Sequence, residues 1–367
     1  MDVVAYISEL LTQAIDNRAS DIHIEPQADH LRIRQRIDGF LVQTDEVPTE
    51  HSLAILSRLK IMGHLDIGER RIPQDGAMTL TQAQATYDVR ISTLPTLYGE
   101  KVVLRLFRNQ FENITLEQLG IDTDEQERLE KLIKRESGLL IVTGPTGSGK
   151  TTTLYAILQK LNQEHRNLVT LEDPVELQIP GMNQVQINTK AGLTFAQGLR
   201  AIMRQDPNVI MIGEIRDRET ADIAIQAALT GHLVLTTLHT SDCASTVTRL
   251  LDMKIEPYRI AAALVGVVAQ RLIRLRCIQC LGNGCIECKR TGYLGRTGVF
   301  EITVVSEELK HFIINMSSNT SLRKYLKQHG IISLSETTMN KVQLGYTTME
   351  EYYRVIEHVE EMGSMES

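Results

Sequence analysis

The sequence predicts an α/β protein in which a small α+β domain precedes a larger domain built on a mostly parallel sheet. Three patterns in its 367 residues support this prediction. Apolar and polar residues alternate at period two through much of residues 1–108, as in half-buried strands. Apolar strand-like runs alternate with helix-like segments over residues 139–237, which favours parallel strands joined by helices. A glycine-rich loop follows the first of these runs and precedes a helix, as in phosphate-binding units.

Residues 1–108 are predicted to form the α+β domain. The helical spacing of apolar residues from Val3 to Ile15 indicates an amphipathic helix. Period-two alternation then indicates strands, and Asp38-Gly39 is a strong hairpin turn between two of them. In chain order the predicted elements are a helix at 3–15, strands at 21–25, 31–37 and 40–42, a helix at 50–62, and strands at 87–92 and 101–107.

Residues 119–367 are predicted to form the second domain, after a polar and irregular linker at 109–118. Its predicted elements are strands at 139–143, 167–171, 208–213 and 232–237 and helices at 150–162, 194–204 and 218–229. This alternating order implies a doubly wound sheet. From residue 244 onward we expect mainly helix, interrupted by a cysteine cluster at 277–288 and ending in a helical tail at 300–367.

The loop at 144–151 fits the P-loop pattern of Gly, four residues, and Gly-Lys-Ser/Thr. Its residues are Gly144, Pro145, Thr146, Gly147, Ser148, Gly149, Lys150 and Thr151. The glycines let backbone N–H groups close around phosphate oxygens, and the helix N-terminus adds a favourable dipole. We expect Lys150 to reach the β- and γ-phosphates of ATP and Thr151 to hold Mg²⁺. A glycine-rich turn that binds nothing is disfavoured because the flanking segments also fit the motif.

Polar residues follow three of the predicted parallel strands, where ligands bind in such sheets. Glu214 ends the strand at 208–213, and P-loop enzymes place an acid on a second strand beside Mg²⁺ and the attacking water. Glu214 is therefore predicted to be catalytic rather than a surface acid. Glu172 either orients water or metal or belongs to an acidic turn set by Asp173-Pro174. His239 is either a sensor of the γ-phosphate or an ordinary hydrogen-bonding residue.

The cysteine cluster has the spacing C-x₂-C-x₄-C-x₂-C. Its members are Cys277, Cys280, Cys285 and Cys288. Four thiolates suit a closed, structural zinc site, and disulfides or a redox dithiol are the alternatives. The fifth cysteine, Cys243, is expected to be a small core residue. Six basic residues lie near the cluster in sequence: Arg271, Arg274, Arg276, Lys289, Arg290 and Arg296. They indicate a solvated basic face, a docking surface for an acidic partner or anionic lipid, or a DNA contact.

Composition narrows the classes of function. A net charge of −7 provides no overall attraction to nucleic acid or anionic lipid. The longest uncharged stretch, Ile223 to Ser241, contains polar residues and two histidines and is a poor membrane span. The N-terminus lacks the charged and apolar regions of a signal peptide. We therefore expect a cytoplasmic protein whose association with membranes is peripheral.

Motifs along nearly the whole chain resemble those of the secretion and type IV pilus assembly ATPases, the GspE/PilB class. In the first domain they lie at 19–25, 70–76, 90–96 and 99–105, and in the second at 144–151, 171–176, 213–217 and 230–240. The resemblance implies a PAS-like first domain followed by a RecA-like P-loop ATPase domain. It also implies that Glu214 is the catalytic glutamate, that Glu172 lies near metal and water, and that His239 belongs to the His box. Arg90 and Arg105 would complete the nucleotide site as the domains close.

The same resemblance implies an assembly and its partners. The family works as a ring of six that hydrolyses ATP and turns domain motion on a polytopic membrane platform protein. The platform adds pilin-like subunits to a filament, so the chain is expected at the cytoplasmic face of the membrane, without direct contact to nucleic acid. The cysteine cluster is typical of assembly ATPases rather than retraction ATPases.

Two departures refine the expectation. The chain opens directly on the first module, which is similar to the competence-pilus ATPases (ComGA) of Gram-positive bacteria and favours a filament for DNA uptake. The sequence Asp206-Pro207-Asn208 replaces the usual Asp-Pro-Asp, which leaves the role of position 208 open. The alternatives are a type II secretion or surface pilus ATPase, a scaffold that binds ATP but scarcely hydrolyses it, and a zinc-containing nucleic-acid binder.

Overall fold

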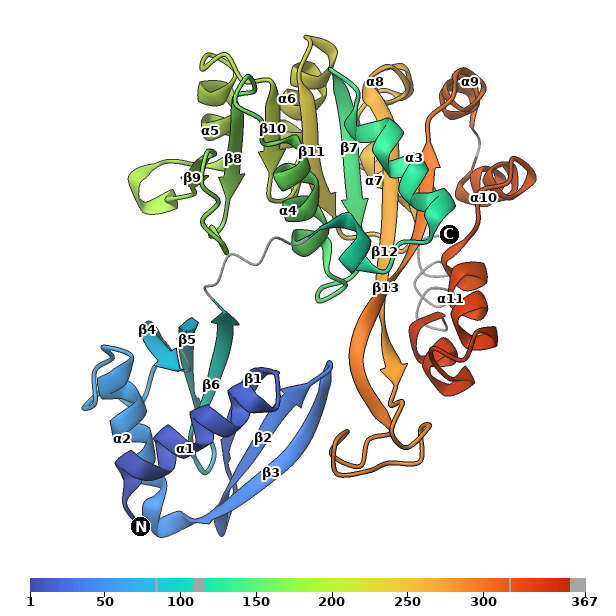
Figure 1. The fold of residues 1–367 in the computed structure, drawn as a ribbon. Coiled ribbons are helices and arrows are strands. Elements are labelled where there is room, and N and C mark those ends of the chain that lie inside the picture. The colour runs from blue at the N-terminus through green and yellow to red at the C-terminus, as the bar shows by residue number, and fades with distance from the viewer. Residues whose placement is uncertain (83–84, 109–114, 317, 357–367) are drawn as a thin grey trace. The chain divides into compact units, whose positions relative to one another are not determined.

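The computed structural model describes residues 1–82, 85–108, 115–316 and 318–356 of the chain (Figure 1). It divides into two compact units, Met1–Glu112 and Asn113–Ser367. Residues 109–114 of the predicted linker lie outside the described residues, and its end overlaps a short 3-10 turn at Leu116–Leu119. Each unit has its own sheet and its own hydrophobic core.

The first unit is a six-stranded antiparallel sheet covered by two helices. Its elements are α1 (Val3–Asp16), β1 (Ala19–Pro26), β2 (His30–Ile37), β3 (Phe40–Pro48), α2 (Ser52–Met62), β4 (Gln74–Gln82), β5 (Ala85–Thr96) and β6 (Gly99–Arg108). The strands lie in the order β3-β2-β1-β6-β5-β4. Leu11 of α1 and Leu59 of α2 are buried in one core with Ile22 of β1. The predicted helices and strands of this region are confirmed.

Strand β4 is the element that the sequence did not predict in this unit. It forms the edge of the sheet, pairs with β5 alone, and alternates half-buried with exposed side chains. Gly76 near its start is a packing requirement, because a Cβ there would lie 2.2 Å from the carbonyl oxygen of Gly63. An edge strand with an internal glycine gives a weak strand signal, which explains the omission.

The second unit is built on a seven-stranded sheet with the order β13-β12-β7-β11-β10-β8-β9. Its first elements are α3 (Thr123–Ile133), β7 (Gly138–Thr143), α4 (Lys150–Leu161), β8 (Leu168–Glu172), β9 (Asn183–Gln186), α5 (Phe195–Ile202), β10 (Val209–Ile212), α6 (Arg218–Leu229), β11 (Leu233–Leu238), α7 (Cys243–Asp252) and α8 (Pro257–Ala263). Neighbouring strands are parallel except β12 and β13. Of these elements, α3 and β9 were not predicted.

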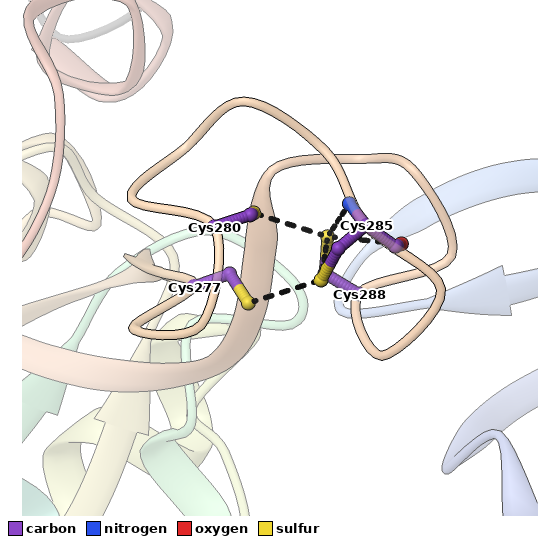
Figure 2. Close-up of side chains that lie close together, drawn as sticks. All are labelled: Cys277, Cys280, Cys285 and Cys288. Carbon is purple, nitrogen blue, oxygen red and sulfur yellow. Dashed lines mark hydrogen bonds between the residues drawn. The ribbon is translucent and has the colours of Figure 1, made fainter.

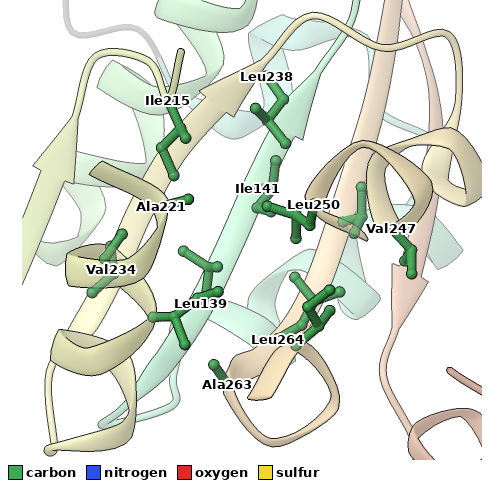
Figure 3. Packing of buried hydrophobic residues seen from close by; sticks show 14 of the residues in the cluster. Leu139, Ile141, Ile215, Ala221, Val234, Leu238, Val247, Leu250, Ala263 and Leu264 are labelled. Atoms are coloured by element: carbon green, nitrogen blue, oxygen red, sulfur yellow. The ribbon is translucent and has the colours of Figure 1, made fainter. Parts of the chain in front are cut away.

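Helices cover both faces of this sheet, as the sequence predicted. Leu139 and Ile141 of β7 face a core shared with α5, α6, α7 and α8 (Figure 3). The alternate residues Leu140 and Val142 face a second core shared with α3 and α4. The carboxyl ends of the parallel strands therefore gather at one edge, where doubly wound proteins bind ligands.

The prediction that the chain is mainly helical after residue 244 is wrong. Beyond α7 and α8, two long antiparallel strands, β12 (Leu264–Arg276) and β13 (Tyr293–Val304), form a hairpin. β12 also pairs with β7 and so extends the parallel sheet. The far end of the hairpin, which carries the cysteine cluster, projects beyond the other strands of the sheet (Figure 1).

The part of the tail that follows β13 is helical. It contains α9 (Glu307–Asn315), α10 (Asn319–Gln328), α11 (Leu334–Gln343) and a last helix at 349–356. Residues 357–367 of the predicted tail lie outside the described residues. Within the described part of the chain, we find no helix that combines the length and apolar character needed to cross a bilayer.

Candidate nucleotide site and cysteine cluster

The glycine-rich loop joins the end of β7 to the start of α4. Gly149 has a φ of +90°, and a Cβ added there would lie 2.8 Å from the Nε2 atom of Gln270 on β12. Gly144 has a φ of +153°, and its Cβ would lie 2.4 Å from the Gln270 carbonyl oxygen. Glycine is therefore needed at both positions for the loop to take its shape against β12.

The amine of Lys150 is buried and rests on the backbone of its own loop. Its Nζ atom donates hydrogen bonds to the carbonyl oxygens of Gly144, at 2.8 Å, and Pro145, at 2.9 Å. Among the described residues, no carboxylate lies within ion-pair distance of it. Burial and the charge of Arg271 lower its pKa to about 8, while the charge of Glu214 opposes this shift. The Oγ atom of Ser148 in the same loop is also buried and makes no hydrogen bond to the described residues. A buried cation and an unpaired hydroxyl at a helix N-terminus fit a bound phosphate.

A cavity of about 440 Å³ opens in front of this loop. Its volume is in the usual range for sites that bind small ligands. It is lined by Thr146, Gly147, Gly149, Lys150, Thr151, Thr152, Leu154, Glu172, Asp173, Pro174, Glu176, Phe195, Met211, Gly213, Glu214, Thr237, His239, Leu272 and Arg296. The structure therefore brings together the loop, both predicted acids and the predicted histidine.

Glu214 follows β10 and lines this cavity. The turn that carries it is fixed to β11, since Thr237 Oγ1 donates to the Gly213 carbonyl at 2.7 Å. Its carboxylate accepts a hydrogen bond from Arg216 and lies 3.6 Å from His239 Nε2. The hydrogen bond from Arg216 holds the pKa of Glu214 below its usual value, while burial opposes this shift. Glu214 is thus ionised at neutral pH and can accept a proton.

His239 lies beside Glu214 with its side chain half exposed. Burial and the charge of Lys150 lower the pKa of its imidazole, although Glu214 acts in the opposite direction. The neutral imidazole can donate one hydrogen bond and accept another. This chemistry fits a group that contacts a phosphate or a water without adding positive charge.

Glu172 ends β8 with its carboxylate buried and held by three donors. Tyr155 and Thr170 each donate a hydroxyl hydrogen bond at 2.5 Å, and Gln184 donates from Nε2 at 3.2 Å. Burial and the bond to Glu172 raise the pKa of the Tyr155 hydroxyl, so it stays a donor. The arrangement fixes the Glu172 carboxylate at the wall of the cavity.

Asn208 lies at the opposite end of β10 from Glu214. Its Oδ1 atom accepts a hydrogen bond of 2.7 Å from the backbone N–H of Asn167, immediately before β8. This bond links the starts of the neighbouring strands β8 and β10. The cavity lies at the opposite, carboxyl ends of these strands. Asn208 is therefore not among the residues that line the nucleotide cavity.

Arg90 and Arg105 belong to the first unit, where they are cross-strand partners on β5 and β6. The Arg105 Nε atom donates to Asp21 at 2.8 Å, and its side chain is 60% exposed. The Arg90 guanidinium lies over the ring of Phe107, 4.5 Å from its centroid. The two guanidinium groups thus lie at one register position, and Asp21 balances the charge of one of them.

Three of the six arginine and lysine residues expected on one basic face lie elsewhere. Arg271 is buried beside the P-loop, where it donates to the carbonyl oxygens of Gln270 and Ser241. Arg274 is buried in an ion pair with Glu351. Arg296 lines the nucleotide cavity. The positions of Arg271 and Arg296 beside the loop were not predicted, because the strands that carry them were not recognised.

The four clustered cysteines form a closed set of sulfur atoms at the tip of the hairpin (Figure 2). All four Sγ atoms lie within 4.8 Å of one another, and three of their separations are 3.7 to 3.8 Å. A tetrahedral zinc ion with bonds of about 2.3 Å places its sulfur ligands about 3.8 Å apart. Backbone N–H groups of Gly284, Cys285 and Gly292 point at the sulfurs of Cys280 and Cys288. The donor set fits zinc, whereas disulfide sulfurs would lie about 2.05 Å apart.

Cys243 is separate from this cluster. It is buried at the start of α7, and burial raises the pKa of its thiol. The expectation that it is a core residue is confirmed.

Comparison with known proteins gives a consistent result. The family model described as "Type II/IV secretion system protein" matches residues 2–354. The chain is 48% identical to the type II secretion system protein HxcR of Pseudomonas aeruginosa, over 96% of this chain and 77% of that protein. It is 43% identical to the type II secretion system ATPase E of Vibrio cholerae, over 96% and 75%.

The fold has solved counterparts as well. The ATPase DotB of Legionella pneumophila superposes with a TM-score of 0.76 at 22% identity, over 96% of both chains. At this identity the likeness concerns the fold. Neither sequence relative is a competence protein, so the expected likeness to competence-pilus ATPases stays a prediction.

Proposed function

The chain belongs to the Type II/IV secretion system protein family and is an ATPase, and from this premise we propose that it is the motor that drives assembly of a secretion or pilus filament. The observation that carries the proposal is the single cavity shared by the P-loop, Lys150 and Glu214. A phosphate-binding cation and an ionised acid that face one space are what hydrolysis of a triphosphate requires.

Each residue of the cavity has a role in this proposal. The loop N–H groups and Lys150 hold the β- and γ-phosphates of ATP, with the amine moving from the loop carbonyls to the phosphate oxygens. The Thr151 hydroxyl would hold Mg²⁺, which would supply positive charge beside the phosphates. The Glu214 carboxylate accepts the proton of the attacking water, and His239 contacts the γ-phosphate. Glu172 fixes the wall of the cavity next to the metal and the water.

Arg90 and Arg105 of the first unit supply the remaining positive charge in this proposal. A guanidinium that approaches the γ-phosphate stabilises the charge that develops there in the transition state. Six copies form a ring, and each cycle of ATP binding and release moves the first unit against the second. The resemblance to the GspE/PilB class and the two separate cores support this part of the proposal.

The ring acts on a polytopic platform protein at the cytoplasmic face of the membrane, and the platform adds pilin-like subunits to a filament. Cys277, Cys280, Cys285 and Cys288 bind a structural zinc ion. The names of the relatives favour a type II secretion filament. A competence filament for DNA uptake is the finer expectation from the sequence, and a surface pilus is a third possibility. Deletion of the gene distinguishes the three by loss of protein export, of transformation or of surface pili.

ATP turnover tests the motor against a scaffold that only binds nucleotide. We expect Glu214→Gln to lower kcat by about a hundredfold or more while ATP still binds, because it removes the proton acceptor but not the phosphate contacts. Glu164→Gln, at an exposed acid after α4, is the matched control and should leave turnover unchanged. Equal kcat values for the wild type and Glu214→Gln would contradict the assigned role.

A further inference from the structure

The tip of the β12–β13 hairpin exposes three aliphatic side chains. Ile278, Leu281 and Ile286 are 80%, 64% and 85% exposed. Each follows one of the clustered cysteines directly in the sequence. Because the four sulfurs lie within 4.8 Å of one another and adjacent Cα atoms are 3.8 Å apart, these side chains belong to one small body, residues 277–292, which we call the knuckle.

The backbone of the knuckle holds these side chains outward. The Cys277 N–H donates to the Gly292 carbonyl at 2.9 Å, and the Arg290 N–H donates to the Cys285 carbonyl at 2.7 Å. The C-terminal end of the knuckle passes close to its central turn, since a Cβ on Gly292 would lie 2.4 Å from the Gly282 carbonyl oxygen. With the interior occupied by sulfur and backbone, the aliphatic side chains have no space to turn inward.

The knuckle is also basic in an acidic chain. The knuckle itself contains Lys289, Arg290 and one acid, Glu287, which gives a net charge of +1, and Arg276 directly before it adds a further positive charge, whereas the whole chain has −7. Lys289 and Arg290 are exposed beside the aliphatic side chains, and Arg276 is half-buried at the base. The surface therefore combines apolar tips with cations.

We propose that the knuckle inserts its aliphatic side chains into the interface of a membrane with anionic lipids. Isoleucine and leucine partition into the headgroup boundary, and neighbouring lysine and arginine attract anionic headgroups. A protein partner is less suited to this surface. A specific interface buries about 800 Å² on each side and is anchored by aromatic residues, but residues 277–292 contain none. The hairpin projects beyond the other strands of its sheet, so its tip lies away from the core of the second unit (Figure 1).

Sedimentation of the full-length, zinc-loaded chain with vesicles tests this proposal. We expect binding to vesicles of phosphatidylcholine and phosphatidylglycerol but not of phosphatidylcholine alone, and weaker binding as salt increases. The double variant Ile278→Ser/Ile286→Ser should bind about tenfold more weakly or worse, because two inserted side chains are lost. Lys289→Gln/Arg290→Gln should reduce binding to the anionic vesicles specifically. Leu229→Ser, at an exposed leucine that ends α6, is the matched control and should bind like the wild type.

Zinc content and ATP turnover are measured on the same samples. A loss of zinc would reveal an unfolded knuckle, and an absence of turnover by the wild type would count against the motor proposal without affecting the lipid proposal. Equal binding of the wild type to neutral and anionic vesicles would overturn the lipid proposal. Undiminished binding of the isoleucine double variant with normal zinc content would also overturn it. Loss of filament assembly by that variant, without vesicle binding by the wild type, would assign the surface to a protein partner instead.

Discussion

Among single residues, Lys150 shows how the site is prepared for an anion. The sequence motif predicted that this lysine contacts phosphate, and the structure adds that its amine rests on two loop carbonyls within a buried site. Burial without a carboxylate partner disfavours the charged amine, which is why its pKa falls to about 8. A bound phosphate provides the missing negative charge and reverses this effect.

We therefore predict that nucleotide affinity decreases as the pH rises through about 8. Below this pH the amine of the free protein is already protonated, and above it binding must first take up a proton. The dissociation constant for a non-hydrolysable ATP analogue should increase about tenfold between pH 7 and pH 9. Calorimetry in buffers of different ionisation enthalpy measures both the affinity and the protons taken up.

Lys150→Arg is the control for this pH dependence. A guanidinium stays protonated throughout the range, so the variant should show the same affinity at pH 7 and pH 9 even if it binds more weakly. An affinity of the wild type that does not change between these pH values would show that Lys150 is fully charged before the nucleotide arrives.

Glu172 illustrates a residue whose type was predictable but whose environment was not. The motif indicated an acid near the nucleotide, and the structure shows its carboxylate fixed by Tyr155, Thr170 and Gln184. None of these three donors is adjacent to it in the sequence. Only the packing of α4 and β9 against β8 brings Tyr155 and Gln184 to it.

We predict that Tyr155→Phe lowers the free energy of unfolding of the second unit by about 1.5–3 kcal/mol. The substitution removes a hydroxyl donor from a buried charged acceptor and keeps the aromatic ring. Urea unfolding followed by circular dichroism measures the change. Tyr258→Phe, at a tyrosine that is 62% exposed, should change it by less than about 0.5 kcal/mol. Equal stability of both variants would mean that Glu172 does not depend on Tyr155.

At the scale of elements, the sequence predicted strands best where each apolar run was short and was separated from the next by a turn or a helix. The parallel strands β7, β8, β10 and β11 were each found to within about two residues, because turns and helices separate them. The hairpin was missed for a physical reason. β12 lies between β7 and β13 and is buried on both faces, so its apolar run lacks the period-two alternation that identifies a strand.

The missed hairpin also explains the missed residues of the site. On a helix, Arg271 and Arg296 would have no defined relation to the P-loop. Because β12 pairs with β7 and β13 pairs with β12, both arginines lie near the end of the sheet where the loop begins. The six basic residues that the sequence placed near the cysteines are therefore divided among the nucleotide site, a buried ion pair, and the knuckle with its base.

We predict that Cys285→Ser releases zinc and unfolds the knuckle while the paired strands of the hairpin persist. Three sulfurs and a hydroxyl hold zinc poorly, whereas the strands keep their hydrogen bonds to each other and to β7. Elemental analysis measures the metal, and hydrogen exchange compares residues 277–292 with the strands. Cys243→Ala, at the cysteine outside the cluster, should retain the wild-type zinc content. Full zinc content in Cys285→Ser would exclude this residue as a ligand.

At the scale of the whole molecule, the residues proposed for catalysis are divided between two units. Lys150, Glu214 and His239 belong to the second unit, and Arg90 and Arg105 to the first. Each unit has its own core, so packing within either one does not require the other. The sequence motifs assigned all five residues to one site, but no periodicity or local pattern shows how two separately packed units meet.

The kinetics of Arg105→Ala test whether the first unit takes part in hydrolysis. If its guanidinium stabilises charge on the γ-phosphate only in the transition state, the variant should lower kcat by about a hundredfold or more and change KM much less. Arg105→Ala also removes the ion pair with Asp21. Burial raises the pKa of Asp21, but hydrogen bonds from Arg105 and Ser20 lower it further, so that the carboxylate is stabilised overall. Asp21→Asn therefore serves as the control, since it removes the same ion pair and keeps the guanidinium. A large fall in kcat for Arg105→Ala, with a small change for Asp21→Asn, would mean that turnover needs the first unit at the nucleotide. Equal kcat for Arg105→Ala and the wild type would confine hydrolysis to the second unit.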